Sequence, residues 1–416
     1  MNSQKLFFLA TVLFAFFPVL PNRLKGLPVI VFFLFSVYGF FSHQRVKKID
    51  LKKVLFFSGI YLFYLLSLFY TENFIAIDKT LSTRLSLLII PISFGLFSTI
   101  VTKIEARQFN IFSIIFVAST IAYCLVVLFT IVHLEYFTGK VTINEVYNIA
   151  TNTLFGIEQH PIYASILISI AIFLSVFKLI KTSNIYGKGM LIIGNTILLF
   201  TLFFFSRKAI ILALAFAFIV FAIINFKKLK IKKILLISTL IFVAALVSTP
   251  VLKKRFKEVF YTVTYSKISP DNSSSIRFGV YKCVLKTIQK HPIIGYGVGD
   301  VDVALQECYA KTSKILVEGN YNSHNQYLGI ALSNGVFGLL FLILFLFYNV
   351  KKAIQHRDKF FLAIVLFYIV TMFFENILER QSGVIIFAFY ICFFNFIKIE
   401  KINSPALEKE DNHYRS

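Results

Sequence analysis

The sequence has 416 residues, of which 57% are hydrophobic and only 15% are charged. Charged residues make up about 25% of a soluble domain, so this composition excludes a soluble protein with a large core and indicates an all-α polytopic membrane protein. The formal net charge of +23 would suggest nucleic-acid binding in a soluble chain. Here most of the charge lies in short loops between apolar runs, where control of membrane topology explains it, so we expect no nucleic-acid partner.

Apolar runs follow one another along most of the chain. A span needs about 20 apolar residues, and about twelve candidate helices lie near residues 6–20, 27–41, 54–70, 85–101, 109–134, 161–180, 190–205, 209–226, 234–252, 325–350, 360–376 and 384–397. Helices are expected because lipid offers no partner for an unpaired backbone amide. The chain then divides into transmembrane helices 1–9 (residues 1–252), a large outer loop (253–324), transmembrane helices 10–12 (325–398) and a disordered cytoplasmic tail (399–416).

Lysine and arginine set the orientation. With the N-terminus in the cytoplasm, the basic segments 43–53, 227–233 and 351–359 all face inward, and the short outer loops hold few basic residues. The positive-inside rule therefore places both termini in the cytoplasm. The long loop 253–323 is also basic, but long loops largely escape this rule.

The long outer loop has structure of its own. Ser273, Ser274 and Ser275 offer an N-cap, apolar residues then recur at helical spacing, and Pro292 after His291 stops the helix. The helix is amphipathic, and two interpretations stay open. It lies on the outer surface of the membrane, or it packs its apolar face inside a small extramembrane domain.

The four cysteines show no metal-ligand spacing, and we expect neither a metal nor a cofactor. Cys283 and Cys308 share the long loop and would pair if it faces an oxidising compartment, but sequence does not fix their separation. The glycines of segment 295–299 do not form a nucleotide loop, because no strand precedes them and no G-K-[ST] follows. This segment is expected to be a turn-rich hinge.

Basic and histidine residues gather on the predicted outer face. Arg207 stands at the N-terminus of the helix near 209–226, where free amides and the helix dipole attract anions. Its guanidinium adds donors matched to phosphate oxygens; the alternative is a snorkelling turn residue. Arg277 lies in the first turn of the loop helix, an unfavourable place for a cation unless an anion joins it.

His324 precedes the apolar run near 325–350, and an ionisable group at such a place is a functional candidate. It could accept a proton near neutral pH, or it is an ordinary interfacial cap. Arg380 adds a further donor, unless it pairs internally with Glu379. Together these groups suit a membrane-held anion, such as a lipid phosphate or pyrophosphate, with a proton acceptor beside it.

Three motifs carry a resemblance to a known family. They are F-S-R-K-A at 205–209, I-R-F-G at 276–279 leading to H-P-I-I-G-Y-G at 291–297, and S-H-N-Q-Y-L at 323–328 followed by N-G-V-F-G at 334–338. In this order the chain resembles the O-antigen ligase/polymerase superfamily of bacterial membrane glycosyltransferases. The resemblance covers residues 205–350, and the first 200 residues match only in hydropathy.

The resemblance implies a C-type glycosyltransferase-like membrane fold and a metal-independent, inverting transfer. The donor would be a glycan on undecaprenyl pyrophosphate, the acceptor lipid A-core, and the place the periplasmic face of the bacterial inner membrane. His324 would be the catalytic residue that activates the acceptor hydroxyl. The substrate-binding residues would be Arg207, Arg277, Lys208, Asn325 and Arg380.

Ligase activity is the leading hypothesis for this chain. Within the superfamily the alternatives are a polysaccharide polymerase and a protein O-oligosaccharyltransferase, which share the donor and differ in the acceptor. From another class, the chain could be a transporter or flippase for the lipid-linked glycan, which would require polar groups running through the spans. The candidate spans are depleted of charge except near their ends, which favours chemistry at one face.

Overall fold

The structure is a computed structural model that describes residues 3–43, 47–138, 154, 156–205, 207–224, 268–270 and 272–400. The expected span at 234–252 lies outside the described residues. So do the tail from residue 401 onward and most of the outer segment that precedes His160.

Helices make up most of the described chain. Those of the bundle are α1 (Ser3–Ala15), α2 (Leu27–Ser42), α3 (Leu51–Leu66), α4 (Ile75–Arg84), α5 (Ser86–Phe97), α6 (Ala106–Thr138), α8 (Pro161–Lys181), α9 (Ile185–Phe205), α10 (Lys208–Ile224), α17 (Gln326–Gln355), α18 (Lys359–Met372) and α19 (Gln381–Phe396). Short 3-10 helices adjoin them: η1 (Phe17–Val19), η2 (Asn22–Leu24), η3 (Ser67–Phe69) and η4 (Ile377–Glu379).

Seven helical stretches among the described residues are long and apolar enough to cross a membrane, and four shorter apolar helices, α1, α10, α18 and α19, accompany them. The all-α membrane architecture is therefore confirmed. The expected span at 85–101 is shifted, because α4 continues almost directly into α5 and the apolar stretch begins earlier, at Ile77–Phe97.

Phenylalanine packing holds the bundle together where tryptophan is absent. The rings of Phe14 on α1 and Phe389 on α19 stack at 4.2 Å, and those of Phe32 on α2 and Phe94 on α5 lie 4.8 Å apart. All four side chains are buried. Offset and edge-on aromatic pairs add to the free energy gained from burial alone, so these rings fix the first helices against the last one.

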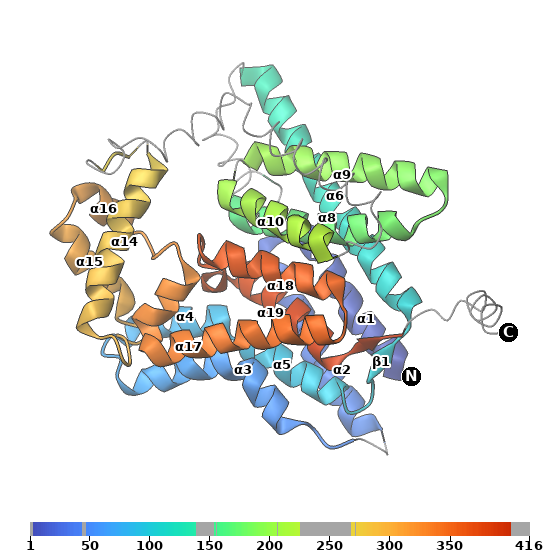
Figure 1. The fold of residues 1–416 in the computed structure, drawn as a ribbon, viewed down its shortest axis with the longest axis horizontal. Coiled ribbons are helices and arrows are strands. Elements are labelled where there is room, and N and C mark those ends of the chain that lie inside the picture. Colours follow the sequence, from blue (N-terminus) through green and yellow to red (C-terminus); the bar gives the residue numbers. More distant parts are fainter. Residues whose placement is uncertain are drawn as a thin grey trace.

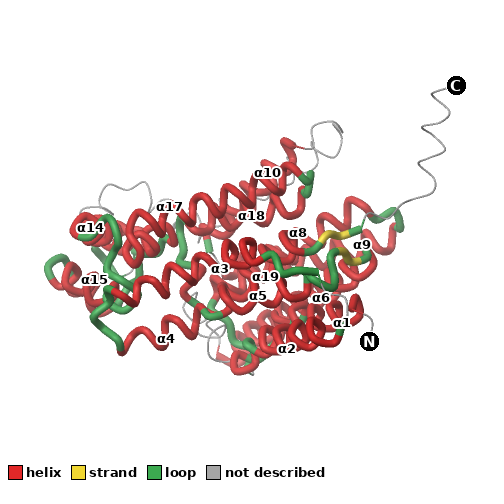
Figure 2. The backbone as a smooth tube through the Cα atoms, turned by 90° about the horizontal axis from the view of Figure 1, so that it is seen from below, coloured by secondary structure: helices red, strands yellow, loops and turns green. Residues whose placement is uncertain are grey.

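The bundle has two distinct ends, and Figures 1 and 2 show them in two views. At one end lie α14 (Ser273–Lys290), α15 (Val301–Ala310) and α16 (Lys314–Gly319). At the opposite end, β1 (Lys103–Ile104) pairs in parallel with β2 (Lys398–Ile399). The α14–α16 unit and the strand pair thus mark opposite faces of the predicted membrane protein.

The predicted loop helix is confirmed as α14, but its N-cap is Asn272, whose side chain accepts hydrogen bonds from the amides of Ser274 and Ser275. Its residues Ile276 and Val280 are buried in a small core. That core consists of Ile276, Val280, Cys283, Val284, Leu305, Tyr309, Leu316 and Leu332. The apolar face therefore packs inside a compact unit against α15, α16 and α17, as the second interpretation held.

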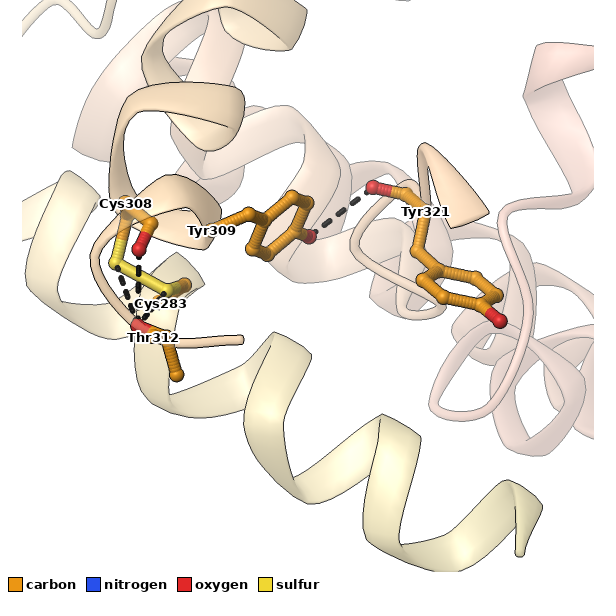
Figure 3. Close-up of a disulfide and its surroundings, with 5 residues drawn as sticks. All are labelled: Cys283, Cys308, Tyr309, Thr312 and Tyr321. Carbon is orange, nitrogen blue, oxygen red and sulfur yellow. Dashed lines mark hydrogen bonds between the residues drawn. A yellow bond between two sulfur atoms is a disulfide. The ribbon is translucent and has the colours of Figure 1, made fainter. Parts of the chain in front are cut away.

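A disulfide joins α14 to α15. Cys283 and Cys308 are bonded across a sequence separation of 25 residues, and the hydroxyl of Thr312 lies 3.3 Å from the sulfur of Cys283 (Figure 3). Nearby, the hydroxyl of Tyr309 donates to the carbonyl of Tyr321 at 3.0 Å. The covalent and hydrogen-bonded links tie α14 and α15 to the segment that leads into α17.

The glycine segment after α14 docks on a break in α17. Gly335 has φ 61° and ψ −158° inside that helix, and the amide freed next to it, that of Val336, donates to Pro292. In return the amides of Tyr296 and Gly297 donate to carbonyls of α17. A side chain at Gly335 would meet the carbonyl oxygen of Ile293 at 2.1 Å. The segment is thus a backbone clamp, which agrees with the rejection of a nucleotide loop.

Replacing both bridged cysteines, as in C283S/C308S, should destabilise the α14–α16 unit by about 3 kcal/mol, because a cross-link of this loop length restricts the unfolded chain. Limited trypsin digestion at Lys311 and Lys314 would report the opening of the unit. Reductant should bring the wild type to the rate of the variant and leave the variant unchanged. Equal cleavage of oxidised wild type and variant would contradict a stabilising role for the bridge.

Candidate functional site

His324 occupies a strained turn between α16 and α17. Its φ of 46° is a left-handed value that residues other than glycine rarely adopt. Two hydrogen bonds hold the turn: the amide of His324 donates to the side chain of Asn322 at 3.0 Å, and its carbonyl accepts from the hydroxyl of Tyr281 at 3.3 Å. Such strain persists only where the surroundings enforce it, and it gathers at functional sites.

The side chain of His324 faces a buried carboxylate. Its Nδ1 lies 3.9 Å from one oxygen of Glu375, whose side chain is 8% exposed. The other carboxylate oxygen accepts from the guanidinium of Arg277 at 2.7 Å, and the same guanidinium donates to the carbonyl of Phe374 at 3.1 Å. The anion that the first turn of α14 requires is therefore supplied within the protein by Glu375.

Glu375 remains ionised in this setting. Burial alone would raise the pKa of its carboxyl, but the interactions with His324 and Arg277 outweigh burial and hold the pKa below its ordinary value. Glu375 was missed in the sequence, although an acidic residue at the end of an apolar run is a functional signal. It lies in the turn between α18 and α19, 98 residues from Arg277 along the chain.

His160 is the N-cap residue of α8 and lies within electrostatic reach of the other two predicted arginines, Arg380 and Arg207. Burial, followed by the positive charges of Arg380 and Arg207, lowers the pKa of its imidazole to about 3. Glu375 acts in the opposite direction, and His324 acts in the same direction as the arginines. Two of the predicted arginines and the predicted histidine thus lie within electrostatic reach of one neutral imidazole, on the side of the molecule that carries α14.

A second carboxylate, that of Glu379, helps to hold the turn that contains His324. Its oxygens accept hydrogen bonds from the side-chain amides of Asn322 and Asn376. Burial raises the pKa of Glu379, although the charge of Arg84 and both amides act against the rise. In the described part of the chain Glu379 is held by these partners and forms no ion pair with Arg380, so the internal pair considered for Arg380 is absent.

The predicted substrate-binding residues separate into two groups. Arg277 pairs with Glu375, whereas Arg380 and Arg207 lie within electrostatic reach of His160, and Arg207 directly precedes α10 as expected. Asn325 instead caps α17, accepting from Leu328 at 3.1 Å, while its amide donates to Phe373 at 3.0 Å. Lys208 is the first residue of α10 and is half-buried.

Within the described ranges, no three histidine, cysteine, aspartate or glutamate side chains gather as metal ligands would. What the residues do offer is a set of guanidinium donors, one ionised carboxylate and an imidazole beside it. Arginine forks match phosphate oxygens in geometry and charge. The arrangement is therefore suited to holding a phosphorylated anion next to a group that moves a proton.

Residues 193–343 match the family model described as O-Antigen ligase. That range contains Arg207, Arg277 and His324 in the order expected. The superfamily resemblance is thereby confirmed for this region. Over 158 residues, or 36% of its length, the chain is also 30% identical to a ComP-specific O-oligosaccharyltransferase of Acinetobacter baylyi. The match spans only 27% of that relative.

Neutralising the buried carboxylate with Glu375→Gln should lower stability at neutral pH by about 2 kcal/mol, because Arg277 loses a charged hydrogen-bond acceptor. Since the folded-state pKa of Glu375 is depressed, its stabilising contribution exists above the ordinary carboxyl pKa and is lost as the pH falls through the lowered value. Thermal unfolding in detergent between about pH 7 and pH 3 would measure both effects.

The exposed Glu307 on α15 provides the control, because Glu307→Gln removes a charge outside the site. That variant should follow the wild type over the whole pH range. The E375Q variant should start lower and decline less in acid. Identical acid profiles for E375Q and the wild type would contradict the ion pair.

Proposed function

We propose that this protein is an O-antigen ligase-type glycosyltransferase that moves a glycan from undecaprenyl pyrophosphate to lipid A-core on the periplasmic face of the bacterial inner membrane. The observation that carries the proposal is the Arg277–Glu375–His324 contact, with Arg207 and Arg380 within electrostatic reach. Arg277 and His324 lie inside the region that matches the O-antigen ligase family, which supports a role for the contact in glycan transfer.

The proposed topology has about twelve spans and both termini in the cytoplasm. Two features, one at each end of the helix bundle, support this topology. The Cys283–Cys308 bridge lies in the α14–α16 unit, next to His324, and disulfides persist in oxidising compartments such as the periplasm. The lysine-rich segments near β1 and β2 lie at the other end, as the positive-inside rule expects of a cytoplasmic face.

In the proposed reaction the arginines bind the pyrophosphate of the donor. Arg207 and Arg380 supply fixed positive charge, while Arg277 is oriented by Glu375 so that its remaining edge can meet a phosphate oxygen. Charge that develops on the leaving pyrophosphate is then stabilised by groups already in place, which is the larger part of catalysis in such sites. This supply of guanidinium donors is what makes a metal-independent transfer chemically reasonable.

His324 acts as the base in this proposal. With Nδ1 directed at Glu375, the carboxylate favours a proton on that nitrogen and leaves Nε2 to accept one from the acceptor hydroxyl. The hydroxyl oxygen bonds to the anomeric carbon as the bond from that carbon to the pyrophosphate breaks, with inversion. The proton stays on His324, and the electron pair leaves with the lipid pyrophosphate.

Protein glycosylation is the second candidate, because the Acinetobacter relative is a ComP-specific O-oligosaccharyltransferase. Polymerisation of the glycan on its carrier uses the same donor site and is a third possibility within the superfamily. A transporter or flippase is less well supported. The cationic groups described above gather at one face, whereas passage through the bilayer would place them along the spans.

His324→Ala and Arg277→Ala should each reduce glycan transfer by about 10²-fold or more, since a positioned base alone contributes 10²–10⁴-fold. The assay uses purified protein with an undecaprenyl-pyrophosphate-linked glycan and lipid A-core. Lys314→Ala is the control, because Lys314 is exposed on α16 and only joins Glu318 at the surface. Wild-type transfer by H324A, in protein that inserts normally, would remove His324 from the site.

A deletion strain should distinguish the acceptors. Loss of all core-attached glycan with carrier-linked polymer retained is expected for the ligase, because only the last transfer is missing. Core bearing a single repeat would instead indicate a polymerase. An unchanged lipopolysaccharide profile with unmodified glycoproteins would contradict the ligase assignment and support transfer to protein.

A further inference from the structure

A cavity of about 940 Å³ lies at the end of the bundle opposite the candidate site. The ends of α3, α8, α17, α18 and α19 surround it, together with β1 and β2. Seven lysines and one arginine line this cavity, and the described lining includes a single carboxylate, that of Asp358. The imbalance leaves a concave surface with strong positive charge.

Two carboxylates offset part of this charge: Asp358 interacts electrostatically with Lys181 and His356, and Asp50 interacts with Lys53. Asp358 also caps α18 by accepting the amide of Phe361 at 2.9 Å. Asp50, the acidic residue nearest to Lys53 along the chain, likewise caps α3 through the amide of Lys53 at 3.1 Å. Both carboxylates therefore serve helix N-termini.

Two half-buried lysines of the lining converge on one backbone carbonyl. The ammonium groups of Lys53 and Lys352 donate to the same backbone carbonyl, that of Asn395, at 2.8 and 3.0 Å. Lys398 lies within electrostatic range of both. Two ammonium groups that share one carbonyl repel each other. No carboxylate of the described residues forms an ion pair with either lysine. An anion in the cavity would relieve the repulsion.

Part of the remaining lining is aromatic and indicates what kind of anion fits. Phe177, Phe360 and Phe396 form part of the wall, and the ammonium of Lys53 lies 4.3 Å from the ring centre of Phe396. A free inorganic anion has no apolar part that could pack against these aromatic rings. An amphiphile places its phosphate among the lysines and its glycerol and first methylenes against the rings, in the way that basic pockets between membrane helices bind anionic lipids.

Topology control alone would account for lysines near this face but not for their arrangement. The positive-inside rule depends on the number of basic residues in short loops. It does not require two ammonium groups on one carbonyl inside a cavity. Lys52 and Lys351, the sequence neighbours of the converging pair, satisfy the same rule from exposed positions outside the lining.

We propose that this cavity binds the phosphate headgroup of an anionic phospholipid from the leaflet opposite His324, through the half-buried Lys53 and Lys352 and the exposed Lys47 and Lys398 of its lining. The site is separate from the proposed glycan-transfer site and does not depend on that function. The bound lipid would supply the negative charge that the converging lysines lack.

Native mass spectrometry of the delipidated full chain in a neutral detergent tests the proposal. Phosphatidylglycerol, phosphatidylcholine and soluble inorganic pyrophosphate are titrated separately. We expect phosphatidylglycerol to bind the wild type with clear preference over phosphatidylcholine. The variant K53Q/K352Q should bind it roughly thirtyfold more weakly, at about 1 kcal/mol for each lysine and 1.4 kcal/mol for each factor of ten.

The matched control is K52Q/K351Q, which removes the same number of charges from the same face and should bind like the wild type. K47Q/K398Q guards against misfolding of the first variant, because both side chains of the lining are exposed; it should also weaken binding several-fold. Equal loss in K52Q/K351Q and K53Q/K352Q would overturn the proposal. Pyrophosphate binding as tightly as the lipid would overturn the lipid as the occupant.

Discussion

The architecture of the candidate site depends on the burial of one carboxylate. Removing Glu375 from water is costly unless its charge is paired. The pairing comes from Arg277 and His324, which arrive from separate parts of the chain. The salt bridge can form only when α14, the turn before α17 and the turn after α18 meet. The proposed function and the packing of these segments therefore depend on the same contact.

The site also shows how a cluster of cations is kept receptive to an anion. Arginine does not lose its proton in proteins, so three guanidinium groups in one region repel each other unless something intervenes. His160 is buried and lies within electrostatic reach of Arg380 and Arg207, and its imidazole stays neutral, with a pKa of about 3. Among the described residues, Arg277 pairs with the carboxylate of Glu375. Under the proposed function, these guanidinium groups are what a diphosphate would meet.

The helices of this structure could be predicted from the sequence more readily than the contacts between them. Apolar runs predict spans because the bilayer allows little besides helices, and the N-cap and proline stop predicted α14 within a residue or two. Whether the apolar face of α14 meets lipid or protein could not be decided, because both environments select the same residue types. The pairing of Cys283 and Cys308 was equally open, since it depends on a distance that only the packing of α14 on α15 sets.

The contact of Arg277 with Glu375 could not be predicted from the sequence for a similar reason. Charge at a helix N-terminus predicted that an anion should join Arg277, but nothing in the local pattern distinguishes a ligand from a carboxylate 98 residues away. The region that matches the family ends at residue 343, so His324 and Arg277 lie inside it while Glu375 and Arg380 lie beyond it. The matched region therefore does not hold a complete site. The turn between α18 and α19 must pack against it to orient Arg277 and His324, and differences in that turn would change the site while the recognisable motifs stay the same.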